Sequence, residues 1–364
     1  MVSPTTKQLS TNKTTKLLRP PTPVGLAVNN TDNAKAMVMT WVTNVTKWKL
    51  DHSKIDALPG DASSRRYFRI KHREKSYIVM YMQPFVDLDD RIPFLQVQNY
   101  LHLVGVPVPE VHHHSAEHGL ILLSDLGDET LLKCLENVSK QKEQIVWFKR
   151  AIDLLVQMQR ATAKQNAAID AYGLYFDVEK LMWEVGFTLT HFYNGVLARQ
   201  MMPIDREKVL NYFSAICHEL ASQPWVFTHR DYHGRNIMVH DDVLCMIDFQ
   251  DARLGCAQYD LASLLRDSYY QLEEETVYEL VQYYYSKLPV ATRGTYKSFV
   301  RVFDLMSIQR NFKAIGSFSS FYTKRQDVRY LKFIGNTFEN VRRNLLKFKD
   351  LEELRSLLFR YYYF

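Results

Sequence analysis

The segment 226–249, VFTHRDYHGRNIMVHDDVLCMIDF, constrains the fold of this chain more than any other stretch. Its apolar runs IMV and VLCMIDF flank the polar triplet HDD, a pattern typical of a β-hairpin. Asp231 precedes the hairpin in a loop, Asn236 stands where the first strand begins, and Asp248 stands where the second strand ends. Since a hairpin returns the chain to the edge from which it started, we expect these three side chains to meet.

Oxygen-bearing side chains gathered in this way suit phosphoryl transfer, which needs alignment and charge compensation more than covalent chemistry from the protein. A loop carboxylate such as Asp231 can orient an attacking hydroxyl and accept its proton. The oxygens of Asn236 and Asp248 are of the kind that Mg²⁺ prefers. Each residue alone is also typical of a turn in which Asp or Asn bonds its own backbone. The three together favour a catalytic carboxylate with a magnesium site beside it.

The pattern along the chain changes near residues 124–127. Before that point, strand-like runs alternate with short helical ones, whereas after about residue 128 the spacing is helical almost throughout, apart from the hairpin. The sequence therefore predicts an α+β fold of two lobes with a cleft at the hinge. The predicted divisions are a disordered tail at residues 1–31, a small, mostly antiparallel β N-lobe that binds nucleotide at residues 32–124, and a larger helical C-lobe, catalytic and acceptor-binding, at residues 125–364.

Several strings of the sequence carry a resemblance to a known superfamily. HRDYHGRN followed by IDFQDA resembles the catalytic loop and metal-binding segment of the protein-kinase-like phosphotransferases, in the aminoglycoside phosphotransferase and choline kinase branch. GDASSRRYFRI, GVPVPEV, GLILLSDLGDETLL and QRNFKAIGSFSSFY follow in the order found in the bacterial N-acetylmuramate/N-acetylglucosamine 1-kinases of cell-wall recycling. The resemblance implies ATP as phosphoryl donor, Mg²⁺ as cofactor and the anomeric hydroxyl of an amino sugar as acceptor.

The resemblance also implies roles for individual residues. Asp231 matches the catalytic aspartate, and Asn236 and Asp248 match the metal ligands. The positions that support the loop are His229, Arg230 and Asp260. The predicted nucleotide-binding residues are Gly60, Asp61, Ala62, Ser63 and Ser64 in a small-residue turn, Arg66 in the strand after it, and Ser124, Asp125 and Leu126 at the hinge. The predicted substrate-binding residues are Glu184 and Arg310.

The sequence departs from the wider kinase pattern in two places. Met80 stands where most kinases have a phosphate-binding lysine, and the helix predicted at PFLQVQNYL has no glutamate to pair with one. Three arginines lie nearby in RRYFR. Strand alternation places Arg66 on one face and Arg65 and Arg69 on the other, which leaves open the arginine that reaches the nucleotide. The departure keeps a nucleotide-binding regulator without turnover as an alternative, beside kinases of aminoglycosides or choline-like alcohols.

Composition narrows the remaining possibilities. The formal net charge of +6 is spread along the chain without a basic run, so no nucleic-acid partner is expected. No stretch has the ~20 apolar residues of a membrane helix. The 4 cysteines form no CxxC pair, which is typical of reduced thiols in a cytoplasmic protein. We expect a monomer, with His112, His113 and His114 in a solvated loop rather than a metal site.

Overall fold

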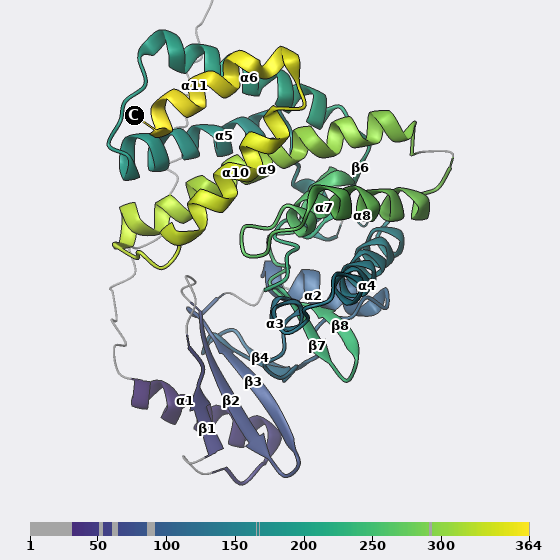
Figure 1. Ribbon diagram of the computed structural model, residues 1–364. Coiled ribbons are helices and arrows are strands. Elements are labelled where there is room, and N and C mark those ends of the chain that lie inside the picture. Colours follow the sequence, from purple (N-terminus) through teal and green to yellow (C-terminus); the bar gives the residue numbers. More distant parts are fainter. Residues whose placement is uncertain are drawn as a thin grey trace, which may run out of the picture.

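The computed structural model describes residues 31–50, 54–59, 65–85, 92–164, 166, 168–290 and 293–363, which form a small sheet-containing lobe and a larger helical lobe (Figure 1). The small lobe holds a five-stranded antiparallel sheet in the order β1-β2-β3-β5-β4. Its strands are β1 (Ile55–Ala57), β2 (Arg66–His72), β3 (Lys75–Tyr81), β4 (Val111–Ser115) and β5 (Leu120–Ser124). The predicted two-lobed α+β fold is confirmed.

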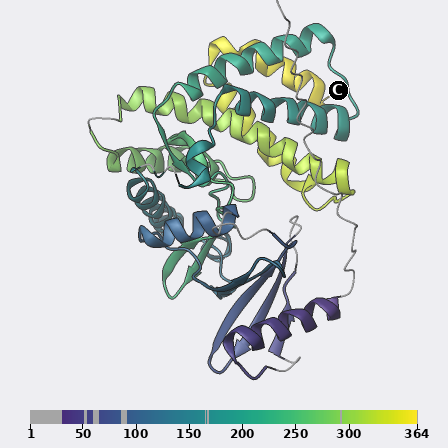
Figure 2. The same cartoon turned by 180° about the vertical axis from the view of Figure 1, so that it is seen from behind.

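Helix α1 (Thr31–Thr46) covers one face of this sheet (Figure 2). Its buried residues include Val38 and Trp41, which belong to one apolar cluster with Phe68, Ile70 and Val79 of the sheet. Phe68 and Ile70 are alternate residues of β2, so this cluster uses one face of the strand and leaves the other face for the cleft.

Two short strands of the small sheet owe their existence to their neighbours, and one of them, β4, lies where the sequence predicts a loop at residues 112–114. Strand β1 has only three residues and pairs Ile55 with Ile70 of β2. Strand β4, VHHHS, pairs with β5, whose residues are almost wholly buried. Three residues are too few to show alternation, and a run of histidines has no strong strand preference. Pairing with a buried neighbour, rather than local propensity, makes these segments strands.

Helix α2 (Pro93–Leu103) lies between β3 and β4 in the chain but packs on the large lobe. Its Phe94 stacks on Phe249, with ring centroids 5.2 Å apart, and the Tyr100 hydroxyl lies 2.7 Å from that of Tyr172. The large lobe also contains α3 (Leu131–Glu136), α4 (Gln141–Ala161), the 3₁₀ turn η2 (Asp170–Gly173), α5 (Val178–Thr188), the π-helical η3 (Leu189–Val196), α6 (Pro203–Ala221), α7 (Gln258–Leu265), α8 (Glu274–Lys287), α9 (Tyr296–Arg325), η4 (Leu331–Phe333), α10 (Ile334–Leu345), η5 (Lys349–Leu351) and α11 (Glu352–Tyr363).

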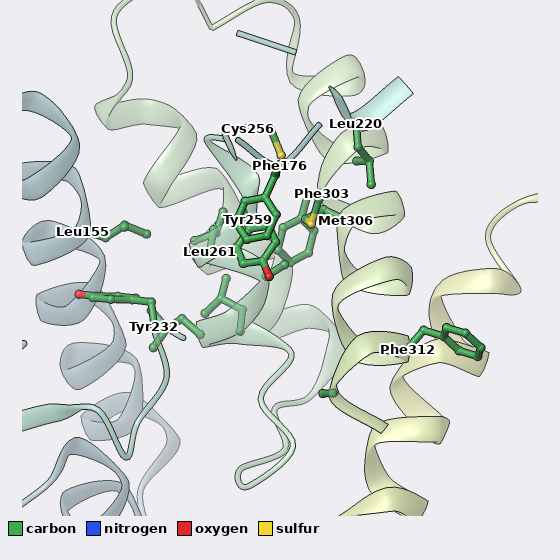
Figure 3. Close-up of a cluster of buried hydrophobic side chains, with 14 of the residues drawn as sticks. Leu155, Phe176, Leu220, Tyr232, Cys256, Tyr259, Leu261, Phe303, Met306 and Phe312 are labelled. Carbon is green, nitrogen blue, oxygen red and sulfur yellow. The ribbon is translucent and has the colours of Figure 1, made fainter. Parts of the chain in front are cut away.

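The 30-residue helix α9 is a central element of this lobe, and much of its length is buried. The surrounding core is rich in aromatic rings: those of Phe176 and Tyr259 stack with centroids 4.0 Å apart (Figure 3). Tyr232, from the loop predicted to be catalytic, enters the same core and donates its hydroxyl to the carbonyl of Ala151 in α4, at 2.7 Å. The loop is therefore anchored to the buried core of the large lobe.

Two pairs of short strands are set among the helices. Strands β7 (Ile237–His240) and β8 (Val243–Met246) form the predicted hairpin, and its turn residues Asp241 and Asp242 both have positive φ, at 48° and 59°. Positive φ at both central positions is the geometry of the type I′ turn that suits the twist of a hairpin. Strand β6 (Trp225–Thr228) pairs with β9 (Arg253–Cys256). Because β6 precedes the hairpin and β9 follows it, this pairing holds both ends of the segment that contains the predicted site.

Cys134, Cys217, Cys245 and Cys256 are free thiols. None of the helices in the described part of the chain is both long and apolar enough to cross a bilayer.

Candidate active site

The loop after β6 is held in place by Asp260 of α7. The two carboxylate oxygens of Asp260 accept the backbone N–H groups of His229, at 2.7 Å, and Arg230, at 2.9 Å. Arg230 has a φ of 82°, an unusual conformation for a residue with a Cβ, and these bonds help to stabilise it. Burial raises the pKa of Asp260 to about 7, against the effect of the two N–H donors. Asp260 therefore lies where the prediction of a loop-supporting residue requires it.

His229 is a structural histidine rather than an exposed acid or base. It is 1% exposed, and its Nε2 lies 2.9 Å from the carbonyl oxygen of Ile247. Burial lowers the pKa of His229, so the neutral ring donates to that carbonyl. The bond ties the loop to the residue directly before Asp248.

Asp231, Asn236 and Asp248 come together at the base of the cleft, as their spacing predicts. The Nδ2 of Asn236 donates to the carbonyl of Asp231, at 3.0 Å, and lies 3.5 Å from Oδ2 of Asp248. Asp248 has a positive φ of 65°, and the N–H of Ile247 donates to the carbonyl of Asn236 at 3.0 Å. All three residues line one cavity of about 500 Å³ between the lobes.

Asp231 is surrounded by cations. Its Oδ1 lies 3.2 Å from Nζ of Lys313 and 3.9 Å from Nη2 of Arg310, both on α9. Burial opposes ionisation of this carboxyl, but Lys313, Arg230 and Arg310 outweigh it and hold the pKa of Asp231 well below its usual range. The carboxylate is therefore ionised at neutral pH. Lys313 is absent from the predicted site, although it follows Arg310 within the same motif, QRNFKAI.

The described residues fit a magnesium ion of the kind that a nucleotide brings with it. They include no cluster of three or more His, Cys, Asp or Glu side chains arranged to hold a metal. Mg²⁺ is usually bound through one or two carboxylates together with substrate phosphates and water, so a full protein cage is not required. Asp248 could supply one carboxylate, and Asn236, whose Nδ2 donates to the carbonyl of Asp231, could supply its amide oxygen.

One end of the cavity lies at the hinge. Its apolar lining includes Ile78, Leu123, Met238 and Ile247, and the segment 124–128 forms its polar edge. These side chains come from both lobes. A ligand with a flat aromatic ring would therefore have apolar contacts on two sides of the ring and backbone groups at its edge.

The three predicted hinge residues line this end, but two of their side chains serve the fold. Asp125 accepts two bonds from the Arg69 guanidinium, at 2.6 and 3.1 Å, and also the N–H of Gly127, at 3.0 Å. The Ser124 hydroxyl lies 3.0 Å from Nε2 of His112. The hinge is thus braced from β2 and β4, and a ligand there would meet mainly backbone groups.

The structure corrects the choice of Arg66 as a nucleotide contact. Arg66 lies on the face of β2 covered by α1, where it donates to the Thr31 hydroxyl at 3.0 Å and sits over the Phe68 ring. Arg65 is the residue that faces the cleft, with Nη1 3.7 Å from Oδ1 of Asp248. The other predicted contacts near this strand, Gly60, Asp61, Ala62, Ser63 and Ser64, lie outside the described residues.

Glu184 and Arg310 do not line the cavity, so the structure does not support direct contact with a substrate in this conformation. Glu184 is 1% exposed and accepts a bond from Gln309 at 3.2 Å. Arg310 is 4% exposed and donates Nε to the Ser263 hydroxyl at 2.8 Å. Arg310 lies 3.9 Å from Oδ1 of Asp231 and helps to lower the pKa of that carboxyl. The far end of the cavity is lined instead by Arg235, Tyr269, Phe321 and Tyr330, none of which the sequence singled out.

Met80, which stands where most kinases of the resembled superfamily have a lysine, is packed in the apolar core. Met80 is 0% exposed and belongs to the core of the large lobe, together with Phe94 of α2. Phe94 stacks on Phe249, the residue after Asp248. An apolar contact thus connects α2 to the metal-binding segment, where most kinases of the resembled superfamily have a lysine–glutamate ion pair.

Comparisons with known proteins agree with this geometry. Residues 54–297 match a family described as the phosphotransferase enzyme family. The N-acetylmuramate/N-acetylglucosamine kinases of Neisseria meningitidis and Pseudomonas aeruginosa are each 31% identical to the chain over 82% of its length and 87% and 86% of theirs.

Solved structures share the fold at low sequence identity. A choline/ethanolamine kinase family protein from Mesorhizobium loti has a TM-score of 0.60 at 12% identity, covering 90% of this chain and 98% of its own. The ADP-bound aminoglycoside phosphotransferase APH(2″)-Ib has a TM-score of 0.58 at 15% identity, covering 84% and 96%. The chain belongs to the phosphotransferase enzyme family and is a phosphotransferase with an alcohol group as acceptor.

Proposed function

We propose that the protein is an ATP-dependent kinase that phosphorylates the anomeric hydroxyl of N-acetylmuramate and N-acetylglucosamine. The observation that carries the proposal is the ionised carboxylate of Asp231, which lies beside Asn236 and Asp248 in one cavity between the hinge and an aromatic wall. The relatives named for these two sugars support the choice of acceptor. The use of ATP and the free thiols support a cytoplasmic location.

ATP would lie with its base at the hinge and its phosphates toward Asp248. In this pose the adenine fills the apolar end of the cavity, and the triphosphate runs toward Arg65 and the Asn236–Asp248 pair. Those two residues would hold Mg²⁺, which when bound neutralises charge on the phosphates. Arg65 supplies a cation of fixed charge from the small lobe, near the position left without a lysine.

In the reaction, Asp231 orients the anomeric hydroxyl for in-line attack on the γ-phosphorus. The hydroxyl oxygen forms a bond to that phosphorus while the bond to the β–γ bridging oxygen breaks, so the products are ADP and a sugar 1-phosphate. The released proton passes to the Asp231 carboxylate and then to solvent. Because the low pKa makes this carboxylate a weak base, its main role is orientation, and proton transfer completes after the new bond has largely formed.

The charge around the cavity disfavours a cationic acceptor such as an aminoglycoside or choline. Such ligands call for acidic side chains around the acceptor, but among the described lining residues Asp125 and Asp128 are at the hinge and Asp248 is at the metal end. Asp231 is itself paired with Lys313, and Arg235 lies on the same side. The arrangement supports a neutral or anionic acceptor. The complete Asp231, Asn236 and Asp248 set also argues against a regulator without turnover.

The test is ADP release from ATP and Mg²⁺ with a panel of N-acetylmuramate, N-acetylglucosamine, an aminoglycoside and choline, with phosphate position assigned by ³¹P NMR. We expect turnover with the amino sugars, and a loss of about 10²–10⁴-fold in kcat for Asp231→Asn. Asp242→Asn, the same change in the exposed hairpin turn, is the matched control. Turnover only with the cationic alcohols, or ATP binding without turnover on any acceptor, would refute the proposal.

A further inference from the structure

The geometry points to Arg235 as the residue that binds the carboxylate of N-acetylmuramate and so favours the anionic sugar over neutral ones. This inference rests on the function proposed above. The two amino sugars differ only in the lactyl ether, whose carboxylate hangs from a ring carbon separated from the anomeric carbon by one other carbon. A cation reached by that carboxylate must therefore lie on the acceptor side of Asp231, within the same cavity.

Arg235 occupies such a position because the loop around it is fixed. It stands between Gly234 and the metal-site residue Asn236. The carbonyl of Gly234 accepts the N–H of Leu132 at 2.9 Å, and a Cβ on Gly234 would lie only 3.2 Å from that nitrogen. The loop is therefore pressed against the start of α3 on one side, while the side chain of Arg235 lines the cavity on the other.

An aromatic platform holds the guanidinium in place. The Arg235 guanidinium lies 4.8 Å from the centre of the Tyr269 ring. Tyr269 is packed edge-on against Phe333, at 4.6 Å, and against His233, at 5.4 Å, and its N–H donates to Asp267 at 3.0 Å. Contact with this ring limits the positions that the guanidinium can adopt, and a guanidinium can donate two bonds to one carboxylate.

The other arginines of the cavity lining lie toward the metal end and the hinge. Among the described lining residues, the arginines are Arg65, Arg69 and Arg235. Arg65 lies at the metal end, 3.7 Å from Asp248, and Arg69 is held at the hinge by two aspartates. The two cations of α9 that face Asp231 are buried and do not line the cavity. Arg235 is therefore the arginine on the acceptor side of the described lining.

The neighbouring lining suits the rest of the ligand. Phe321 and Tyr330 have ring centroids 4.5 Å apart and line the same end of the cavity. Aromatic faces of this kind pack against the apolar C–H face of a sugar ring and its methyl groups.

The experiment changes the charge of the enzyme and the charge of the substrate independently. The value of kcat/KM is measured by ADP release for N-acetylmuramate and for its neutral methyl ester, with the wild type and with Arg235→Gln. A charge-assisted contact predicts that the wild type prefers the acid by about 10–100-fold and that the variant loses this preference to within about threefold. Arg301→Gln, which breaks an exposed pair with Glu219, is the matched control and should keep the wild-type ratio.

The outcomes separate this inference from the proposed function. Absence of turnover with every amino sugar would overturn both. Turnover with equal kcat/KM for acid and ester in the wild type, or an unchanged preference in Arg235→Gln, would overturn only the role of Arg235. Should Arg235→Gln not fold, the wild-type comparison still decides whether the carboxylate is recognised, and Arg235→Lys, which keeps the charge without the bidentate geometry, replaces it.

Discussion

Arg65 and Arg66 are neighbours in sequence but face opposite sides of the small sheet, and this contrast gives a sharp prediction. Arg65 lines the cavity beside Asp248, whereas Arg66 bonds Thr31 and covers Phe68 under α1. We expect Arg65→Gln to weaken ATP binding with little effect on stability. We expect Arg66→Gln to do the opposite.

The magnitudes follow from the surroundings of each side chain. Loss of a charge-assisted contact to phosphate costs about 1.5–3 kcal/mol, which raises the KM for ATP about 10–150-fold. The 3.7 Å pair of Arg65 with Asp248 involves a 46% exposed carboxylate, so its loss changes the free energy of unfolding by less than about 1 kcal/mol. Arg66 loses one hydrogen bond and one cation–π contact, together about 1–2 kcal/mol of stability.

The assay is steady-state kinetics with varied ATP at saturating amino sugar, together with urea unfolding of the same two variants. Each variant serves as the control for the other, because both remove one positive charge from the same strand. Equal increases in the KM for ATP in the two variants would show that general charge, and not the direction of the side chain, sets nucleotide affinity. An unchanged KM in Arg65→Gln would refute the role given to this arginine.

Three other predictions concern the loop and its charges. Lys313→Met should lower kcat by about 10-fold or more, because the Asp231 carboxylate loses the charged partner, 3.2 Å away, that orients it. Lys313→Arg should recover part of the activity. Lys208→Met, which breaks an exposed ion pair, is the control in the same ADP assay. Asp260→Asn should lower the free energy of unfolding by about 1–3 kcal/mol in urea titrations, because an amide cannot accept both loop N–H groups with the same strength. The pKa of Asp260 in the folded state, about 7, lies above its value in the unfolded state, so this group contributes stability at low pH that is lost as the pH rises to about 7. Asp260→Asn should lack this dependence of the free energy of unfolding on pH. An equal dependence in the wild type and the variant would contradict the prediction.

The sequence was sufficient for features set by local chemistry. The hairpin β7–β8 was predictable because its turn residues and flanking apolar runs specify a two-residue connection. The meeting of Asp231, Asn236 and Asp248 was predictable because a hairpin leaves no other place for its two ends. The brace from Asp260, by contrast, followed from the resemblance, because nothing in the local pattern joins α7 to a loop that precedes it by some thirty residues.

Features set by contacts distant in sequence were not predictable in the same way. Alternation along β2 separated Arg66 from Arg65, but only the packing of α1 shows which face is covered. Glu184 was predicted to bind substrate, yet its helix α5 packs on α9 and buries it beside Gln309. Lys313 reaches Asp231 from α9, an element that no periodicity relates to the loop. Arg235 lies in the loop itself, and only the structure shows that its side chain lines the cavity. Strands β1 and β4 exist because their neighbours pair with them.

Because the chain lacks the lysine–glutamate pair of most kinases, the positive charge around its cleft lies on other residues. With Met80 buried and Phe94 packed on Phe249, the centre of the small lobe can offer only apolar contact to the metal-binding segment. In the pose proposed above, the charge near the phosphates would come from Arg65, which lines the cavity, whereas Lys313 is buried against Asp231 and serves that carboxylate. Arg65 belongs to the small lobe and Asp248 to the large lobe, so the 3.7 Å between Nη1 of Arg65 and Oδ1 of Asp248 depends on how far the cleft is closed. We therefore expect charge compensation at the phosphates to depend on the position of the small lobe.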